Sequence, residues 1–328
     1  MIRYWKAGTD GLWENDKNIL MAPVDTEIFI EENGLDGDEF RKILERAKSV
    51  LLHYRNQRLR PATDPKIITS WNALMVQAYL HVFRITGEAR FLESAEKLAN
   101  FLLNNAGEPG GGLNHLATHG RPIPGFLDDY STMILSLIAL HSASLEEKWL
   151  QKAREFAGTA IKHFYDKPGG LFYFTGSNHE KAFAQRQEIH DNVIPSANSM
   201  MMEGLYLLSQ LFEDKNYLTI AKRGVNGLYE NIIRHPASFS NWGRLLLMLR
   251  YPFYTFAISG EDAGSHLQQI TPEFLPQVLI TGSKTRTNIP LSKNLYQESA
   301  THIHICSGSE CYPPFGGVDE AIRFLHSR

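Results

Sequence analysis

The feature that most constrains this chain is a threefold internal repeat. Three long segments align without gaps, beginning at Trp71, Asp129 and Ala197, with offsets of 58 and 68 residues. Identical residue types recur at matched positions: Met75, Met133 and Met201, then Ala95, Ala153 and Ala221. Such self-similarity is typical of arrays in which each unit buries an apolar face on its neighbour.

Each repeat predicts two antiparallel helices. In the first repeat, Met75, Tyr79, Val82 and Phe83 follow the spacing of one apolar helical stripe. Gly87 predicts the helix end, and the short turn after it makes the next helix an antiparallel neighbour. A small residue at one matched position allows neighbouring helices to approach closely: Ala78, Ser136 and Gly204.

The links between hairpins predict the overall architecture. Two long links, 106–125 and 166–194, each carry Gly-Gly-Leu and enter the first helix of the next repeat. Long loops on one face suit a closed α/α toroid with a functional mouth better than an open superhelix. The sequence therefore predicts a mainly α fold, an α/α-hairpin toroid.

Flanking segments complete the expected organisation. Apolar periodicity predicts a helix from Phe40 to Arg60 and a short one from Asn241 to Arg250, while strands and a closing helix follow Tyr251. We expect an N-terminal extension at 1–37, toroid hairpins at 38–250 and a small α/β segment at 251–328.

Composition narrows the functional classes. The formal net charge is −3, which gives no general attraction to nucleic acid or anionic lipid. The longest stretch without charged side chains, Tyr130–Leu145, is too short and too polar to span a membrane. Two cysteines cannot form a disulfide framework, so a cytoplasmic location is expected, without nucleic-acid or membrane partners.

Polar residues gather where the long links enter the helices, and we expect them to converge at the toroid mouth. Two carboxylates facing a cleft suit glycoside hydrolysis, whereas a carboxylate–His or His–His pair suits proton abstraction beside a sugar carbonyl, hence epimerisation. The catalytic candidates are Asp129, Asp191 and Glu188, and the substrate-binding candidates are Asp64, Lys66, Trp71, Asn72, Tyr130 and Asn198. His115, His119, Arg121 and His190 lie in the same links.

Structural interpretations compete with these roles. Ser70, Asp128 and Ser196 stand at matched helix starts, where such residues usually cap the helix by accepting a backbone N–H. A polar network that only holds loops, without catalysis, is therefore an open alternative for the whole mouth.

In the C-terminal segment, His302, His304 and Cys306 alternate along an expected strand, and Cys311 follows. This alternation would bring zinc-ligand types together. The Cys spacing does not match the usual zinc or redox motifs, so we expect an ordinary strand, no metal and no cofactor.

Four segments resemble the YyaL-type, spermatogenesis-associated proteins: DPKIITSWNALM (64–75), GFLDDYSTMI (125–134), EIHDNVIPSANSMM (188–201) and ICSGSECYPP (305–314). This family combines an N-terminal thioredoxin-like domain with a six-hairpin, glycosidase-like toroid. The resemblance implies motif positions at Asp64, Lys66, Trp71, Asn72, Asp128, Asp129, Tyr130, Glu188, Asp191, Pro195, Ser196, Asn198, Cys306 and Cys311. The usual second acid of the first motif is Pro65 here, and Ala73 and Ala197 replace expected glycines.

The resemblance implies that the chain corresponds to the C-terminal part of such proteins, without the thioredoxin-like domain and with an incomplete toroid. We expect a carbohydrate-binding or carbohydrate-processing protein of glycosidase or epimerase type; the alternative is a non-catalytic scaffold that works with a thioredoxin-like domain or partner. The expected partners are a sugar-like small molecule and either a second copy or a chain that supplies the missing toroid half. The exposed stripe of Phe40–Arg60 would be covered by that copy, by that chain or by residues 1–30.

Overall fold

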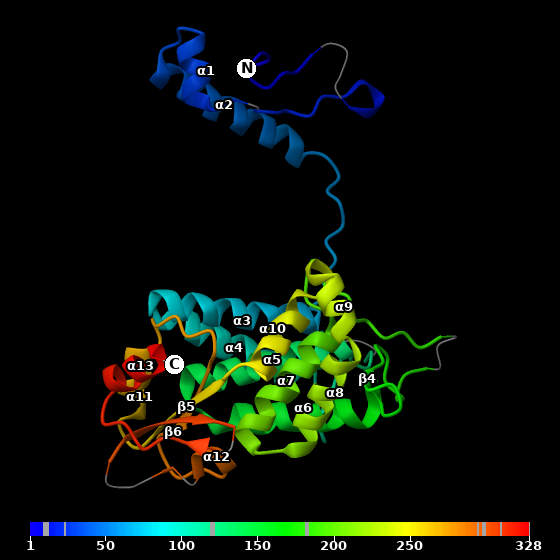
Figure 1. The fold of residues 1–328 in the computed structure, drawn as a ribbon. Helices are drawn as coiled ribbons and strands as arrows, with labels where there is room; N and C mark the ends of the chain where they lie inside the picture. Colours follow the sequence, from blue (N-terminus) through cyan, green and yellow to red (C-terminus); the bar gives the residue numbers. More distant parts are fainter. Residues whose placement is uncertain are drawn as a thin grey trace. The chain divides into compact units, whose positions relative to one another are not determined.

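The structure, a computed structural model, describes residues 1–8, 13–22, 24–118, 122–180, 184–293, 295–296, 300–308 and 310–327. It divides into two compact units, Met1–Pro65 and Lys66–Arg328 (Figure 1). The division falls at Pro65, whereas we expected boundaries after residues 37 and 250. The expected first toroid helix therefore belongs to the first unit, and the C-terminal α/β segment clusters with the hairpins.

The first unit has a small core of its own, which explains the shifted boundary. Its elements are η1 (Glu14–Asp16), α1 (Thr26–Glu32) and α2 (Gly37–Asn56). Phe40 and Leu44 on α2 are buried together with Tyr4 and Ile30. Of the three coverings considered for this stripe, residues 1–30 are the one that buries Phe40 and Leu44.

The second unit contains the three predicted hairpins. They are α3 (Thr69–Thr86) with α4 (Ala89–Asn105), α5 (Leu127–Ser144) with α6 (Glu147–Phe164), and α7 (Ala197–Phe212) with α8 (Lys215–Gly227). Gly87 ends α3 at a φ of 70°, a conformation that glycine adopts without a Cβ clash. α9 (Tyr229–Arg234), η2 (Pro236–Ser238) and α10 (Ser240–Arg250) follow. The expected hairpin repeat is confirmed.

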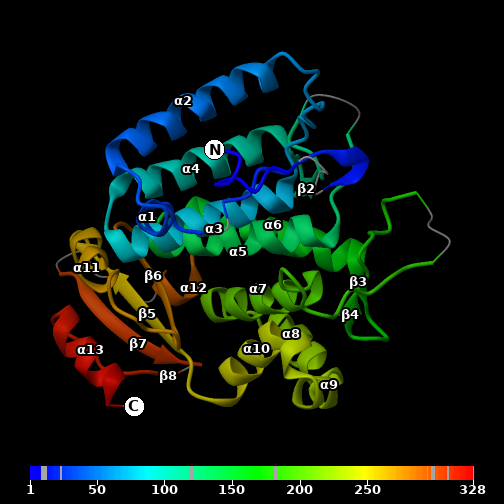
Figure 2. The same cartoon turned by 90° about the horizontal axis from the view of Figure 1, so that it is seen from above.

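The first helices of the hairpins lie side by side, α3 against α5 and α5 against α7, and α10 lies against α7 (Figure 2). The matched small residues allow this packing. Ser136 donates a hydrogen bond to the carbonyl of Ala73 at 2.7 Å, and a Cβ on Gly204 would stand 2.8 Å from Ile134. At both positions the small residue faces the preceding first helix.

Two-stranded sheets begin the links between hairpins. β1 (Gly107–Glu108) pairs with β2 (Gly112–Leu113), and β3 (Tyr165–Asp166) pairs with β4 (Leu171–Phe172), both antiparallel. The Gly-Gly-Leu signature thus reaches the second strand of each pair, as short hairpins predict.

The C-terminal segment is a four-stranded sheet in the order β6-β5-β7-β8. Its elements are β5 (Tyr254–Ser259), α11 (Ala263–Ile270), β6 (Val278–Ser283), α12 (Pro290–Lys293), β7 (His302–Ser307), β8 (Glu310–Cys311) and α13 (Val318–His326). β5 is parallel to β6 and antiparallel to β7, and β7 is antiparallel to β8. Figure 2 shows α11 and α13 on one face of the sheet. The expected strands and closing helix are confirmed, and so is the mainly α fold class with α/α hairpins and a small α/β segment.

The sheet is attached to α5 by buried polar contacts. His141 Nε2 lies 2.7 Å from Thr281 Oγ1, and the Ser142 hydroxyl donates to the carbonyl of Ile280 at 2.7 Å. Burial lowers the pKa of His141 to about 4, so its ring is neutral at physiological pH. These contacts hold β6 against the C-terminal end of α5.

Candidate functional site

Asp129 joins the starts of two helices. Its side chain is fully buried, with an exposed fraction of 0%. Oδ1 accepts the backbone N–H of Ser70 at the start of α3, and Oδ2 accepts that of Phe126 before α5, both at 2.9 Å. Oδ2 also lies 2.9 Å from His115 Nδ1. The carboxylate therefore connects α3, α5 and the link between them.

Asp191 does the same for the next pair of helices. Oδ1 accepts the Ser196 N–H and the Ser199 hydroxyl at the start of α7, each at 2.8 Å. Oδ2 accepts the N–H of Asn241 at the start of α10, also at 2.8 Å. Both oxygens of each expected catalytic aspartate are thus occupied by donors of the fold.

The matched residues Tyr130 and Asn198 hold the small sheets. The Tyr130 hydroxyl accepts the N–H of Leu113 at 3.0 Å, and Asn198 Oδ1 accepts the N–H of Phe172 at 2.7 Å. Asn72, at the equivalent position of the first repeat, donates to the carbonyl of Ile68 at 2.8 Å. All three expected substrate-binding side chains contact backbone.

The expected caps are confirmed only at Ser196, whose hydroxyl accepts the N–H of Ser199. For Ser70 and Asp128 the expectation was wrong. α3 and α5 begin two residues earlier than expected, with Ile68 and Phe126 at the N-cap positions, and neither N-cap side chain caps its helix with a hydroxyl or carboxylate. The physical reason is that Asp129 reaches the backbone at both helix starts itself.

The remaining candidates are dispersed. Trp71 is 65% exposed, and Glu188 forms an ion pair with Arg186 at 2.7 Å. Asp64 belongs to the first unit, whereas Lys66 opens the second. The His190 ring packs on Phe239. His119 and Arg121 lie outside the described residues.

His115 and Asp128 form the titratable pair of this region. A carboxylate oxygen can only accept, so His115 Nδ1 carries hydrogen toward Asp129, and Nε2 is left able to take up a proton. The His115 side chain is 23% exposed. Its hydrogen bond to Asp129 raises the pKa of the imidazole despite the opposing effect of partial burial.

Asp128 is a carboxyl that holds its proton to a higher pH than an ordinary aspartate does. Burial, followed by the neighbouring charge of Asp129, raises the pKa of the Asp128 carboxyl to about 6. The Ser70 hydroxyl opposes this rise without reaching hydrogen-bond geometry, and Asp128 Oδ1 has no hydrogen-bond partner among the described residues. A base and an acid with shifted pKa values therefore stand beside each other at the start of α5.

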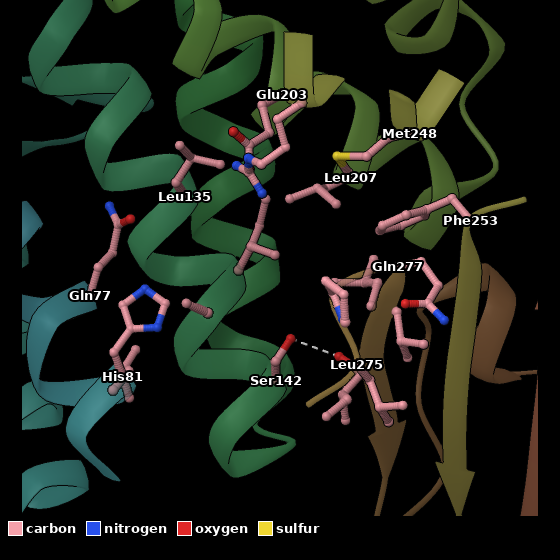
Figure 3. A pocket seen from close by; sticks show the side chains of 18 of the residues that line it. Gln77, His81, Leu135, Ser142, Glu203, Leu207, Met248, Phe253, Leu275 and Gln277 are labelled. Carbon is pink, nitrogen blue, oxygen red and sulfur yellow. Dashed lines mark hydrogen bonds and ion pairs between the residues drawn. The ribbon is translucent and has the colours of Figure 1, made fainter. Parts of the chain in front are cut away.

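A groove of about 640 Å³ runs along the faces of α3, α5, α7 and α10, and residues 271–280 line its other side. Figure 3 shows Gln77 and His81 on the α3 side, Leu135 and Ser142 on α5, and Leu275 and Gln277 near the sheet. Asp128 is seven residues before Leu135 on α5, which places it about 10 Å further along that helix. The His115–Asp128 pair thus lies beyond the helix-start end of the groove.

Glu203 is the buried charge of the groove. Its side chain is only 6% exposed and forms an ion pair with Arg244, which is 55% exposed. Arg244 Nε also donates to Asn241 Oδ1 at 3.4 Å. The groove therefore carries a fixed carboxylate whose cationic partner keeps donors in contact with solvent.

Arg84 is a second cation in the lining. Its Nη2 donates to the carbonyl of Glu273 at 3.3 Å, and the structure records no ion pair for it within the described residues. Burial lowers the pKa of its guanidinium. A half-buried cation with only a carbonyl partner is costly unless an anion joins it.

Glu203, Arg84 and Arg244 did not emerge from the sequence as candidates. A signal was present for Glu203, since it is the sole charged residue of the otherwise apolar and small-residue helix Ala197–Phe212. A lone charge on a buried helix marks a site where a partner or ligand is required.

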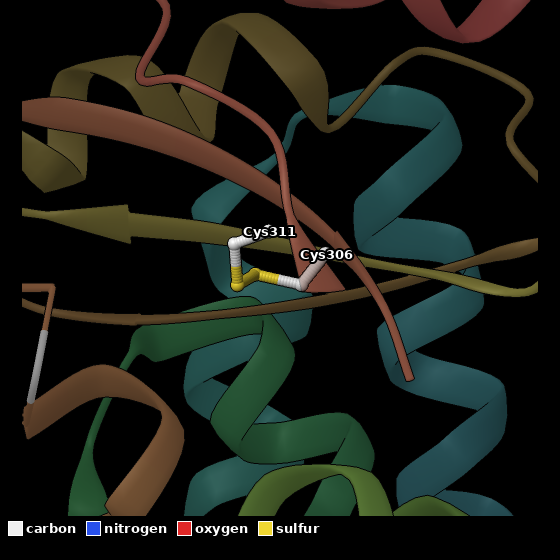
Figure 4. The surroundings of a disulfide bond; sticks show 2 residues. All are labelled: Cys306 and Cys311. Carbon is white, nitrogen blue, oxygen red and sulfur yellow. A yellow bond between two sulfur atoms is a disulfide. The ribbon is translucent and has the colours of Figure 1, made fainter. Parts of the chain in front are cut away.

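The C-terminal cysteines form a disulfide between β7 and β8, where Cys306 and Cys311 are register partners (Figure 4). Both sulfurs are thereby used, so they do not join His302 and His304 as zinc ligands in this structure. No cluster of three metal-ligating side chains occurs within the described ranges. From the low cysteine count we expected no disulfide framework. The structure nevertheless contains one disulfide, because two cysteines on adjacent strands suffice for a single bond.

Across the part of the chain that the structure describes, every helix is too short or too polar to cross a bilayer.

Fold and groove together define an α/α-hairpin protein with a largely apolar groove, which also carries a few charged side chains, between its first helices and a sheet. The chain is similar to spermatogenesis-associated protein 20 of Homo sapiens, with 25% identity over 335 aligned residues, 94% of this chain and 42% of the human protein. The protein of the same name in Mus musculus is 24% identical over 332 residues, with the same coverage of 94% and 42%. The resemblance expected from the motifs is confirmed. The chain spans about two fifths of the length of these relatives, and no protein-family model matches it.

Three solved structures resemble part of the chain, each with a TM-score of 0.43. They are the unsaturated glucuronyl hydrolase of Bacillus sp. GL1, at 18% identity, covering 59% of this chain and 62% of that one; the cellobiose 2-epimerase of Bacillus thermoamylovorans, at 13%, covering 53% and 47%; and a family 76 α-mannanase of Bacteroides thetaiotaomicron, at 15%, covering 52% and 46%. At this level of similarity, no activity or residue role is transferred from them.

Proposed function

We propose that the second unit binds a carbohydrate and transfers a proton on it, in the manner of a sugar epimerase. The observation that carries the proposal is the hydrogen bond between His115 Nδ1 and buried Asp129, beside Asp128 with its pKa of about 6. An oriented imidazole and a carboxyl with a raised pKa are the types of base and acid that such a reaction needs.

The proposed step is proton transfer next to a sugar carbonyl. His115 Nε2 takes the proton from the carbon beside the carbonyl, and the electron pair of that C–H bond forms a carbon–carbon double bond. The carbonyl oxygen then takes the proton of Asp128, which leaves a neutral enediol and an Asp128 carboxylate. The carbon–carbon double bond then takes a proton from solvent on the other face of the carbon, and the enediol hydroxyl returns its proton to Asp128. His115 releases its proton to solvent, which completes epimerisation.

Hydrolysis is less well supported by the same geometry. It needs two carboxylates that are available to the glycosidic bond. Asp129 and Asp191 already accept three hydrogen bonds each from the fold. We therefore assign these two residues to positioning and keep the acid–base role for His115 and Asp128. The cytoplasm remains the proposed location.

The test is exchange of the sugar C2 proton for deuterium in D2O, followed by NMR over a panel of reducing sugars. We expect His115→Ala and Asp128→Asn each to slow exchange by about 10²-fold or more. His326→Ala on the exposed α13 is the matched control and should leave the rate unchanged. Exchange with no sugar, or exchange indifferent to both variants, would refute the proposal.

A non-catalytic scaffold is the second candidate, favoured by the complete occupation of the Asp129 and Asp191 oxygens. It would work with a thioredoxin-like domain, a second copy or a chain that supplies the missing toroid half. Light scattering with and without such a domain separates the candidates. A stable complex together with no exchange on any sugar would support the scaffold.

A further inference from the structure

We infer that the groove is a binding site for an acidic polyol, a sugar that bears a carboxylate or a phosphate, with its anionic group at Arg84 and its hydroxyls near Glu203. The inference rests on the proposed carbohydrate function and adds the charge and direction of the ligand. It uses residues of the groove, not the His115–Asp128 pair.

The charge of the lining favours an anion. Two arginines, Arg84 and Arg244, and one glutamate, Glu203, are its permanently charged side chains. Because Glu203 already pairs with Arg244, Arg84 is the charge that remains uncompensated within the described residues. A guanidinium is well suited to bind carboxylate or phosphate because its fork of donors matches two oxygens.

The two ends of the groove differ in a way that orients the ligand. Arg84 stands near the sheet, since it contacts the carbonyl of Glu273 two residues before Leu275. Figure 3 places Glu203 at the opposite end from Leu275. An anionic group at the Glu203 end would meet a like charge, so it belongs at the Arg84 end.

The polar groups of the Glu203 end fit hydroxyls. The Glu203 carboxylate can only accept hydrogen bonds, and the Arg244 guanidinium can only donate them. Together they can accept a hydrogen bond from a sugar hydroxyl and donate one to the same hydroxyl. Gln77 Nε2 donates to Ser136 Oγ at 3.1 Å, which leaves its carbonyl oxygen as an acceptor toward the groove. Between the ends, Leu135 and Leu207 offer apolar surface for the sugar carbons. About 640 Å³ is within the usual range for such small-molecule sites.

The experiment is calorimetric titration of the full chain with glucose, glucuronate and glucose 6-phosphate. We expect at least one acidic sugar to bind about tenfold or more tightly than glucose, as one charge-assisted pair provides. Tighter binding of glucuronate would identify the anionic group of the ligand as a carboxylate, and tighter binding of glucose 6-phosphate would identify it as a phosphate. The preference should weaken at high salt, because part of it is an interaction between charges.

Variants locate the site. Arg84→Gln should reduce the binding of the acid to the level of glucose, while Arg84→Lys should retain part of the preference. Arg223→Gln is the matched control, since Arg223 on α8 also donates to a carbonyl, that of Pro168, but lies outside the groove lining. Melting curves of all variants verify folding.

The inference would be overturned by equal affinity for all three sugars in the unaltered chain, or by acid binding that Arg84→Gln leaves intact. Neither affects the proposed proton transfer, which the deuterium exchange of His115→Ala and Asp128→Asn tests separately. Absence of any binding by the unaltered chain would also overturn the inference, and the exchange experiment would then decide the proposed function alone.

Discussion

The carboxylates at the helix starts and the carboxylate in the groove are both buried, but they are satisfied in opposite ways. Asp129 accepts two backbone N–H groups and His115, and Asp191 accepts two backbone N–H groups and a hydroxyl. Among the described residues, Glu203 forms its ion pair with Arg244, whose side chain is 55% exposed. The hydrogen-bond acceptors of Asp129 and Asp191 are thus filled by donors of the fold, whereas Glu203 has a partner that is exposed to solvent.

This difference separates residues that hold the structure from residues that are available to a ligand. A buried carboxylate whose oxygens accept backbone hydrogens stabilises the elements that it joins. A buried ion pair often contributes little net stability because desolvation opposes the attraction. The comparison therefore predicts that substitutions at the two places affect different properties.

The largest expected effect is on stability at the helix starts. Asp129→Ala leaves the N–H groups of Ser70 and Phe126 without an acceptor, and we expect it to lower the free energy of unfolding by about 3 kcal/mol or more. Glu230→Ala, which removes a pair with both side chains 72% exposed, is the control and should cost less than about 1 kcal/mol. Urea titration measures both. If both variants lowered the free energy of unfolding equally, Asp129 would not be a residue that holds the structure.

A smaller effect should appear in the pH dependence of Asp128. The pKa of this carboxyl is about 6 in the fold against 3.8 ordinarily, so the folded state binds the proton more tightly than the unfolded state. The free energy of unfolding must then fall as pH rises from about 4 to about 6. Above this range, Asp128→Asn should be more stable than the unaltered chain, on the order of 2 kcal/mol.

His115 acts in the same direction at higher pH. Its pKa is raised, so its contribution is present below the ordinary value of 6.5 and is lost as pH rises through the folded value. In His115→Ala the stability curve should flatten in that upper window only. A flat profile in the unaltered chain, measured by urea titration at successive pH values, would contradict the assignment of both groups.

The smallest change in stability is expected at Glu203. Glu203→Met removes a carboxylate from a helix already rich in methionine, and Arg244 can be solvated because its side chain is 55% exposed. We expect the free energy of unfolding to change by less than about 1 kcal/mol, or to rise. Titration with the sugars should show weakened binding. A loss of stability as large as that of Asp129→Ala would show that Glu203 also holds the fold.

Much of the fold follows from the sequence because hairpins are local. The spacing around Met75 and the stop at Gly87 concern contacts within one repeat, where periodicity and glycine chemistry apply directly. The division at Pro65 differs from the expected boundary after residue 37 for the opposite reason. Phe40 packs on Tyr4, a contact across a segment without regular periodicity that no pattern in α2 reveals.

The candidate site was located in the correct loops, but its roles were not predicted. Asp129 reaches Ser70 across 59 residues, and this contact makes the carboxylate an acceptor at the start of α3. Burial, followed by the charge of Asp129, raises the pKa of Asp128. Local capping rules consider only neighbours along the chain. The sequence did not reveal the groove, because Arg84 and Glu203 lie in different repeats and belong to no common sequence motif.

The attachment of the sheet to α5 also orders events during synthesis. His141 and Ser142 contact residues 140 and 138 positions further along the chain, whereas each hairpin closes within its own repeat. Local contacts form early, and contacts of long sequence separation form late. At about 5–20 residues per second, the ribosome needs several seconds to pass from α7 to β6. During that interval His141 and Ser142 at the end of α5 lack their partners on β6, so we expect the three hairpins of a nascent chain to form before the sheet docks on them.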